Sequence, residues 1–369
     1  MSTDFLSLPG AVAATGIDAG VPAHYGNPMG EQRALADGTA VVEVARGVVT
    51  VSGDDRLSWL DSLTSQRLIG LPAGASAESL LLDPNGRIEH DLRIVDDGST
   101  TWIITEAPAA ASLATFLDRM RFMLRVEVAD RSADFSVIGA FSAVALDGIE
   151  SVALWQDPWR SPSPGGVTYA QNPEHPSSEW TWFESVVPVA SLAAVALDIV
   201  AGRRRVAGTL ALDALRIAAW RPRLGVDTDE RSIPHELDWL RSAVHMNKGC
   251  YRGQETVAKV HNLGHPPRRV VLLDLDGSEG VPVPTGAVVF AERAGEQVEV
   301  GLVTSSAIHY ERGPVALAVI KRTVPSGAVL TVMADGIAIA AAQEVIVPEG
   351  AGRAVEVPRI SRVAAAPRA

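Results

Sequence analysis

The residues most suited to chemistry gather around the single cysteine of the chain, Cys250, in the stretch MNKGCYRGQETVAKV (246–260). A thiol reacts as its thiolate, and nearby cations lower its pKa from the usual value of about 8.5. Lys248 and Arg252 stand on either side of the cysteine. The pattern therefore predicts a reactive thiol, with Cys250, Lys248 and Arg252 as candidate catalytic residues. The alternative is a small packed side chain, which is the commonest role of an unpaired cysteine.

Two glycines and a predicted helix start complete this stretch. Gly249 and Gly253 would admit backbone angles that are closed to other residues, and they would let a ligand or partner approach the backbone closely. Gln254 and Glu255 suit the first turn of a short helix, where free N–H groups favour negative charge. If Cys250 lies near that helix start, the same field favours its thiolate.

Histidines offer two other arrangements. A nucleophilic pair would use His245 or His261 as the base for Cys250. His261 and His265 have the spacing of zinc ligands on one helix face, but a glycine and two prolines interrupt a helix there, and no further ligand is evident. We therefore predict no metal site.

The bulk composition excludes several classes of protein. With 44 acidic and 32 basic residues the net charge is -12, which repels nucleic acid phosphates and argues against direct nucleic acid binding. One cysteine cannot form an internal disulfide, so a reducing compartment fits best. The first residues, MSTDFLSLPGAVAATG, lack the features of a signal peptide, and no apolar stretch of about 18 residues follows. We therefore expect a cytoplasmic protein with no membrane partner.

Hydrophobic periodicity predicts an α+β region followed by a β domain. In order, we expect strands over 40–53, a helix over 54–68, an antiparallel meander over 78–106, a helix over 107–124, strands over 126–141, a loop over 155–176, and helices over 189–202 and 207–220. After the proline pair at 266–267, short Val-rich runs between Gly and Pro indicate a small closed or nearly closed β domain. The predicted divisions are a mobile start (1–20), an α+β region (21–264), a β domain (265–348) and a mobile tail (349–369).

The stretch from Lys248 to Glu255 resembles the K-G-C-[YF]-x-G-Q-E signature of the YgfZ family of folate-binding proteins, relatives of the glycine cleavage T-protein, an aminomethyltransferase. The run GVDTDERSIPHELDWLRSAVHMN, from Gly225, is similar to the family's G-x-D-x-D-x-x-x-x-P-x-E segment. The resemblance extends to HYGNPMGEQRAL, VTVSGDD, LLDPNGRIEHDLRI and GLVTSSAIHY, and so covers roughly residues 22–348. It implies a T-protein-like fold, in which two interleaved α+β subdomains surround a funnel and a β-barrel follows.

The resemblance also implies a ligand and partners. Family members bind tetrahydrofolate or a related folate, and they are implicated in iron–sulfur cluster assembly or repair and, through it, in tRNA modification. For this chain it implies an accessory protein without independent catalytic activity, whose partners are a folate-like small molecule and iron–sulfur enzymes or assembly proteins. A lone thiolate cannot build a cluster, but it can ligate iron transiently, exchange with a persulfide or form a mixed disulfide.

Two positions depart from the T-protein pattern. Where the T-protein has an aspartate pair, this chain reads Glu89-His90-Asp91, which leaves Asp91 as the candidate catalytic carboxylate. Where many relatives have L-R-I-E-A-G, whose glutamate binds the pteridine ring, residues 215–220 read LRIAAW, with Ala218 at the glutamate position. Pterin N–H groups left unpaired in a buried pocket would cost roughly 1–3 kcal/mol.

Candidate cofactor-binding residues come from the segments around this departure and around the cysteine. Asp227 and Asp229 are acids that could replace the missing glutamate, and Trp220 would either stack on a pterin or close the core. The set is completed by Arg216, Tyr251, Gln254 and Glu255. Two alternatives remain: a tetrahydrofolate-dependent aminomethyl or methyl transferase, which explains the fold but which His90 and Ala218 argue against, and a silent binding module in which the cysteine only packs.

Overall fold

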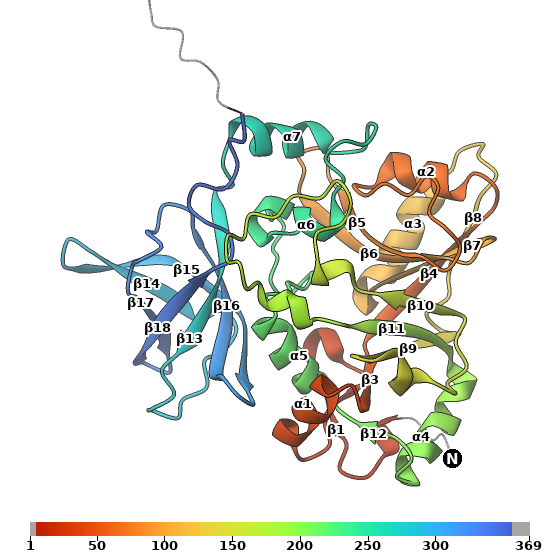
Figure 1. Cartoon of the computed structure of the whole chain (residues 1–369), viewed down its shortest axis with the longest axis horizontal. Helices are drawn as coiled ribbons and strands as arrows, with labels where there is room; N and C mark the ends of the chain where they lie inside the picture. The colour runs from red at the N-terminus through yellow and green to blue at the C-terminus, as the bar shows by residue number, and fades with distance from the viewer. Residues whose placement is uncertain (1–4, 356–369) are drawn as a thin grey trace, which may run out of the picture.

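Two five-stranded sheets and a closed six-stranded barrel form the framework of the computed structural model, which describes residues 5–355 (Figure 1). The first sheet contains, in spatial order, β10 (Ala153–Gln156), β11 (Phe183–Pro188), β9 (Phe135–Ala140), β3 (Ala40–Val44) and β12 (Arg205–Val206). The second contains β5 (Ser76–Leu82), β6 (Ile88–Asp96), β7 (Thr100–Glu106), β4 (Arg46–Ser52) and β8 (Glu127–Asp130). The barrel contains β13 (Arg268–Leu275), β16 (Gly313–Lys321), β15 (Glu296–His309), β14 (Val288–Arg293), β17 (Leu330–Ala334) and β18 (Ile337–Val345).

The two sheets are interleaved along the chain. β3 belongs to the first sheet, the chain then builds the whole second sheet from β4 to β8, and it returns to the first sheet from β9 to β12. Ladders are antiparallel except for the short β3–β12 pair. Strand β6 is the middle strand of an antiparallel meander and pairs with both β5 and β7. The sequence predicts this meander over 78–106.

Seven α-helices connect these strands among the described residues, and none of them is long and apolar enough to span a membrane. They are α1 (Pro28–Ala36), α2 (Arg56–Leu63), α3 (Ala110–Met120), α4 (Leu192–Val200), α5 (Thr209–Ala218), α6 (Leu240–Ala243) and α7 (Gln254–Leu263). Helices α2 and α3 bury apolar side chains such as Leu60 and Leu113 against the second sheet. Helix α4 covers the first sheet, while α5 packs against β15 of the barrel. Figure 1 shows α5 and α6 between the barrel and the sheets.

Helix α3 ends earlier than its apolar pattern predicts. The expected helix over 107–124 stops at Met120, because Phe122 has a left-handed φ of 47° that an α-helix cannot accommodate. Phe122 and Met123 then stand 81% and 97% exposed. These two side chains continue the apolar periodicity of the sequence, but they do not pack in the core.

Separate apolar cores fill the barrel and the space between barrel and sheets. The barrel interior is packed by its own side chains, as expected for a small barrel. A second cluster joins Trp155 and Trp239 of the α+β region to Leu272 and Leu317 of the barrel. This shared core fixes the barrel against the sheets and closes one side of the cavities described below.

The chain ends pack differently from the mobile segments expected at 1–20 and 349–369. Short strands β1 (Val12–Ala13) and β2 (Pro22–His24) pair, Phe5 is fully buried, and Asp18 forms a 2.8 Å ion pair with Arg223. These contacts hold residues 5–20 on the body of the protein. At the other end Ala351 is buried. Residues 1–4 and 356–369 lie outside the described part of the chain.

Candidate functional site

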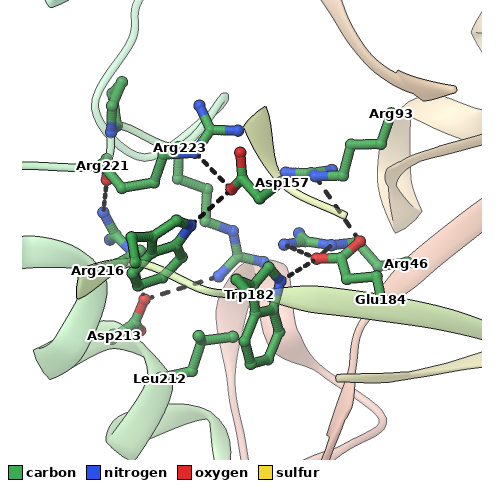
Figure 2. A pocket seen from close by; sticks show the side chains of 12 residues that line it. Arg46, Arg93, Asp157, Trp182, Glu184, Leu212, Asp213, Arg216, Arg221 and Arg223 are labelled. Carbon is green, nitrogen blue, oxygen red and sulfur yellow. Dashed lines mark hydrogen bonds and ion pairs between the residues drawn. The ribbon is translucent and has the colours of Figure 1, made fainter. Parts of the chain in front are cut away.

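An internal cavity lies where the two sheets meet the segment around α5, and we call it the inner chamber (Figure 2). Its open interior measures about 30 Å³, room for one or two water molecules, and the figure rises to about 370 Å³ when gaps between atoms and space open to solvent are included. Figure 2 shows Arg46, Arg93 and Glu184 on one side and Arg216 and Arg221 on the other. The full lining is Arg46, Arg93, Asp157, Trp180, Trp182, Glu184, Leu212, Asp213, Arg216, Arg221, Pro222 and Arg223.

Strand alternation delivers charged side chains to this interior. On β6, Leu92 and Ile94 pack toward α3, so Asp91 and Arg93 project from the opposite face of the sheet. Glu78 of β5 stands directly opposite Arg93 in the ladder. An alternating polar and apolar strand usually has its polar face in solvent, but here the polar face is buried as well as the apolar one.

Every arginine of the inner chamber is held by buried or half-buried carboxylates. Such pairs are costly to break, because one partner removed leaves the other charge buried and uncompensated. The pairs are Arg46 with Glu106 and with Glu184 (3.1 Å), Arg93 with Asp91 (3.0 Å), Arg216 with Asp213 (2.6 Å) and Asp227 (2.8 Å), Arg221 with Glu78 (2.5 Å) and Asp157 (3.0 Å), and Arg223 with Asp18 (2.8 Å) and Glu106 (2.8 Å).

Several polar atoms of the network nevertheless lack a hydrogen-bond partner among residues 5–355. They include Nη1 of Arg93, Nη1 of Arg221 and Oε2 of Glu184, and all three residues line the inner chamber. Buried polar atoms are almost always hydrogen-bonded to protein or to ordered water. These atoms therefore indicate that the chamber holds water or a polar ligand.

Asp91, the predicted catalytic carboxylate, is fully buried beside this chamber. Its Oδ2 lies 3.0 Å from Arg93 Nη2 in an ion pair, but the geometry is not that of a hydrogen bond, and neither carboxylate oxygen has a hydrogen-bond partner in the described chain. Burial raises the pKa of Asp91 to about 7, against the opposing effect of Arg93. A carboxyl group in this state can take up or release a proton near neutral pH. Burial lowers the pKa of the adjacent His90 to about 4, so that residue is neutral there.

A second, larger cavity adjoins the inner chamber, and we call it the outer pocket. It measures about 910 Å³, including space open to solvent, and it shares the wall residue Trp180 with the chamber. Ala218, the departure from the family pattern, lies in its wall. The lining is Ala36, Asp37, Phe141, Pro176, Glu179, Trp180, Leu215, Ala218, Ala219, His309, Tyr310, Glu311 and Arg312.

The predicted cofactor-binding acids are already engaged by protein groups. Asp227 is buried and accepts hydrogen bonds from Arg216 Nη1 (2.8 Å) and Thr304 Oγ1 (2.6 Å), as well as from Ser305. Asp229 pairs with Arg268 of the barrel at 2.6 Å. Both acids thus tie the α+β region to the barrel, and the structure gives neither of them an open carboxylate edge toward the cavities.

Trp220 lies in the core between barrel and sheets. It is 1% exposed and contacts His175 edge-on, with ring centroids 4.9 Å apart. Its φ of 59° is left-handed, at the position where the family pattern has glycine. That conformation costs of order 1–3 kcal/mol in a non-glycine residue, so the buried contacts of the ring must offset strain.

Cys250 is exposed, which excludes the packed alternative for this cysteine. Lys248 turns away from it: the side chain is 1% exposed, and Nζ donates to the carbonyl oxygens of Thr64 (2.7 Å) and Gln66 (2.8 Å) beyond the end of α2. Arg252 pairs with Glu89 at 2.5 Å. The two flanking cations therefore anchor the loop to the second sheet and its helix.

The glycines of the cysteine motif differ in role. Gly253 has a φ of 83°, and a Cβ there would lie 2.6 Å from the carbonyl oxygen of Asp83, so only glycine fits. Gly249 has no left-handed φ and faces open space. As the sequence predicts, α7 begins at Gln254, with Glu255 in its first turn.

Neighbouring side chains complete the description of this loop. Tyr251 is buried, with Lys248 Nζ 5.2 Å from its ring centroid. His261, a candidate base, instead contacts the Tyr169 hydroxyl at 3.0 Å through Nδ1, and Cys250 makes no hydrogen bond in the described chain. No group of three or more His, Cys, Asp or Glu residues between 5 and 355 is arranged to hold a metal ion.

The predicted residues thus occupy two places. Asp91, Arg216 and Asp227 belong to or adjoin the inner chamber, whereas the cysteine motif forms an exposed loop on the second sheet side. Sequence reasoning missed the arginines and carboxylates that dominate the chamber. Two signals were present: charged residues at alternate positions of strand β6, and the RPR run at 221–223 directly after α5.

Comparison with known proteins supports the fold and the resemblance. No family model matches the chain. The chain is 26% identical over 249 residues to a mitochondrial iron–sulfur cluster assembly factor, an IBA57 homolog, from Mycosarcoma maydis, covering 62% of this chain and 55% of that protein. It is 24% identical over 308 residues to a chloroplastic protein from Arabidopsis thaliana whose assigned name is that of a transferase, covering 74% of this chain and 64% of that protein. The chain thus spans between half and two thirds of the length of these relatives.

A solved structure matches almost the whole chain. The glycine cleavage system aminomethyltransferase T from Bartonella henselae has a TM-score of 0.71 and 19% identity, and the match covers 94% of this chain and 96% of that one. The chain therefore has a T-protein-like α+β fold with a C-terminal β-barrel, as the sequence predicts. Together with the likeness to the assembly factor, this fold confirms the resemblance drawn from the cysteine motif.

Proposed function

We propose that this protein is an accessory factor of iron–sulfur cluster assembly or repair that binds a folate and uses Cys250 as its reactive group. The exposed thiol of Cys250, on a loop anchored on both sides, is the observation that carries the proposal. Likeness to an iron–sulfur cluster assembly factor supports the same role. Its partners are then iron–sulfur enzymes or assembly proteins, and through them tRNA-modifying enzymes; it works in a reducing compartment, the cytoplasm, without direct nucleic acid contact.

The chemistry of the proposal follows from a single thiol. Binding of iron forms one S–Fe bond as the thiol proton passes to water. Clusters are typically held by several cysteine thiolates, so the remaining ligands must come from the donor or the client protein. One accessible thiolate suits transient handover, because a site with one protein ligand cannot retain the cluster.

Whether the chain suits a folate can be judged from its two cavities. The outer pocket offers the aromatic side chains of Phe141, Trp180 and Tyr310, and a flat ring can stack on such side chains. The inner chamber adds a buried carboxylate oxygen of Glu184 with no hydrogen-bond partner among residues 5–355. These groups fit a ring with N–H donors despite Ala218. When bound, tetrahydrofolate would supply a carrier for a one-carbon unit.

Cells lacking the gene, complemented with wild type or with Cys250→Ser, test the proposal. We expect wild type to restore the activity of cluster-containing enzymes and Cys250→Ser to restore less than about a tenth of it. Gly249→Ala, a change in the same exposed loop, is the matched control and should restore full activity. Equal restoration by Cys250→Ser, at equal protein levels, would overturn the role of the thiol.

A folate-dependent aminomethyl or methyl transferase is the second candidate, and one observation favours it. Asp91 is a buried carboxyl with a pKa raised to about 7, which suits a group that moves a proton. In this function Asp91 would hold a proton at its Oδ atoms beside the ligand. Assay of methylene transfer from tetrahydrofolate-bound carbon by wild type and Asp91→Asn decides it: activity lost in the variant supports the transferase, and no activity in wild type rejects it.

A further inference from the structure

We propose that the loop after α3 is a docking anchor, in which Phe122 and Met123 insert into an apolar pocket of the iron–sulfur protein that approaches Cys250. The inference rests on the proposed function, because it names the surface on which that partner binds. The loop belongs neither to the cysteine motif nor to the walls of the inner chamber and the outer pocket.

The loop presents the two most exposed large apolar side chains of the described chain, Phe122 and Met123. Neither packs in an apolar core among residues 5–355. Phe122 also holds a left-handed φ of 47°, a conformation that strains a non-glycine residue. The fold gains no buried contact in return for this strain. Exposed apolar surface that the fold does not use is typical of an interaction site.

Helix α3 connects this loop to the cysteine loop. The guanidinium carbon of Arg252, two residues after Cys250, lies 5.4 Å from the centroid of the Phe116 ring. Phe116 and Met120 lie one turn apart on the same face of α3, which corresponds to about 6 Å of helix. Phe122 follows two residues later. A single partner can cover both loops, because a typical interface takes about 20–30 residues from each side.

Charges beside the apolar tip favour a protein over an anionic membrane. A membrane anchor of this kind needs cations that are free to attract anionic lipids. Most of the nearby arginine charge is instead engaged by exposed or half-exposed carboxylates. The ion pairs are Arg121 with Asp118 (2.9 Å) and Arg125 with Asp54 (3.0 Å) and Asp55 (2.8 Å). Arg119 is exposed and has no ion pair among residues 5–355. One free cation attracts an anionic membrane weakly, whereas an apolar protein pocket needs none.

Free cations beside the cysteine loop indicate the charge of the partner. Arg67 follows the residue whose carbonyl oxygen accepts from Lys248. Arg87 follows a glycine on which a Cβ would lie 3.4 Å from the carbonyl oxygen of Gly253. Both arginines are exposed and form no ion pair within the described chain, and the exposed acid Glu255 can offset only one of them. The partner surface that fits is therefore an apolar pocket with carboxylates beside it.

A double variant, Phe122→Asn with Met123→Ser, separates docking from folding. Asparagine tolerates a left-handed φ better than phenylalanine does, so stability in urea should be unchanged or raised. The rate at which maleimide alkylates Cys250 should equal that of wild type. In cells lacking the gene, at equal protein levels, we expect the variant to restore less than about a third of the activity of cluster-containing enzymes, because two anchoring side chains are lost.

Ala294→Asn is the matched control for this variant. Ala294 is exposed and has a left-handed φ of 53° in the hairpin between β14 and β15 of the barrel. The same relief of backbone strain at this distant site should leave the cell activity at the wild-type level.

Cross-linking identifies the partner at both positions. Cys250 is the only cysteine, so benzophenone maleimide labels it alone in wild type and labels only position 123 in Cys250→Ser/Met123→Cys. In cell extracts both labelled proteins should cross-link the same iron–sulfur protein, identified by mass spectrometry. Cys250→Ser/Leu197→Cys, labelled at an exposed position of α4, should not cross-link it.

Full activity of the double variant, with activity lost in Cys250→Ser, would overturn the inference and leave the proposed function standing. Equal activity of wild type, the double variant and Cys250→Ser would overturn both. The inference also fails if position 123 cross-links no protein or a different one from Cys250. It fails as well if wild type floats with vesicles of equal parts phosphatidylcholine and phosphatidylglycerol and the double variant does not, since the loop would then bind a membrane.

Discussion

The inner chamber and the cysteine loop contain the same kinds of charged residue in opposite settings. In the chamber, four arginines are buried and a fifth, Arg46, is half-buried, all of them among carboxylates. In the loop, one thiol is exposed while its flanking cations are turned into contacts with the body of the protein. The comparison teaches that charge beside a functional atom in sequence does not establish charge beside it in space. In both regions the cations hold neighbouring groups in place. The atoms without hydrogen-bond partners are the ones free to react or to bind a ligand.

Removal of a charge from the chamber should lower the free energy of unfolding far more than removal of a charge from an exposed ion pair. Arg223→Met leaves Asp18 and Glu106 buried with fewer partners, so we expect a loss of about 3–5 kcal/mol in the free energy of unfolding. Urea unfolding followed by circular dichroism measures it. Arg125→Met, which breaks an exposed pair with Asp54 and Asp55, is the control and should change stability little. Similar losses in both variants would contradict the contrast between buried and exposed charge.

Asp91 should make the free energy of unfolding of the protein depend on pH. Its folded-state pKa of about 7 lies above the usual value, so its contribution is fully present below about pH 4 and is lost as pH rises through about 7. Asp91→Asn removes the titration while keeping the shape of the protonated side chain. Relative to wild type, the variant should be somewhat stabilising at pH 5 and more strongly stabilising at pH 8 in urea unfolding, because the wild-type contribution falls between about pH 4 and pH 7. Parallel pH profiles for the two proteins would show that Asp91 is ionised throughout.

Lys248 should act on the cysteine loop through structure. Lys248→Met removes the donor to carbonyl oxygens at the end of α2, and we expect about 1–3 kcal/mol less stability and faster amide hydrogen exchange over 246–252. Lys259→Met on the exposed face of α7 is the control and should change neither quantity. Unchanged exchange in Lys248→Met would mean that the loop is held by its other contacts alone.

The sequence predicted most of the fold, because strand and helix periods are local. The meander, α2, α4, α5, the start of α7 and the barrel follow from apolar spacing and turn residues. The end of α3 did not, since Phe122, Met123 and Leu124 continue the apolar pattern while the backbone turns away at Phe122. Packing of residues 5–20 was also invisible, because the Asp18–Arg223 pair joins positions far apart in the chain.

The site was less predictable than the fold, because its contacts join positions far apart in the chain. The motif indicated the special backbone conformation at Gly253, but it could not show that Lys248 points into the body of the protein. Asp227 and Asp229 were chosen because they are acids near the right segment, yet both are engaged by arginines. Glu184 was not predicted as a site residue, because it is a single glutamate in an apolar strand. Its oxygen without a hydrogen-bond partner can be recognised only when β11 is placed beside β4 and β6.

Tetrahydrofolate titration of wild type and Cys250→Ser by calorimetry tests most directly the claim that folate recognition and thiol chemistry occupy separate regions of one fold. The account predicts micromolar binding with dissociation constants for the two proteins equal within about 2-fold, while only wild type supports cluster-containing enzymes in cells. Absence of binding to wild type, or binding lost on replacement of the thiol, would contradict it.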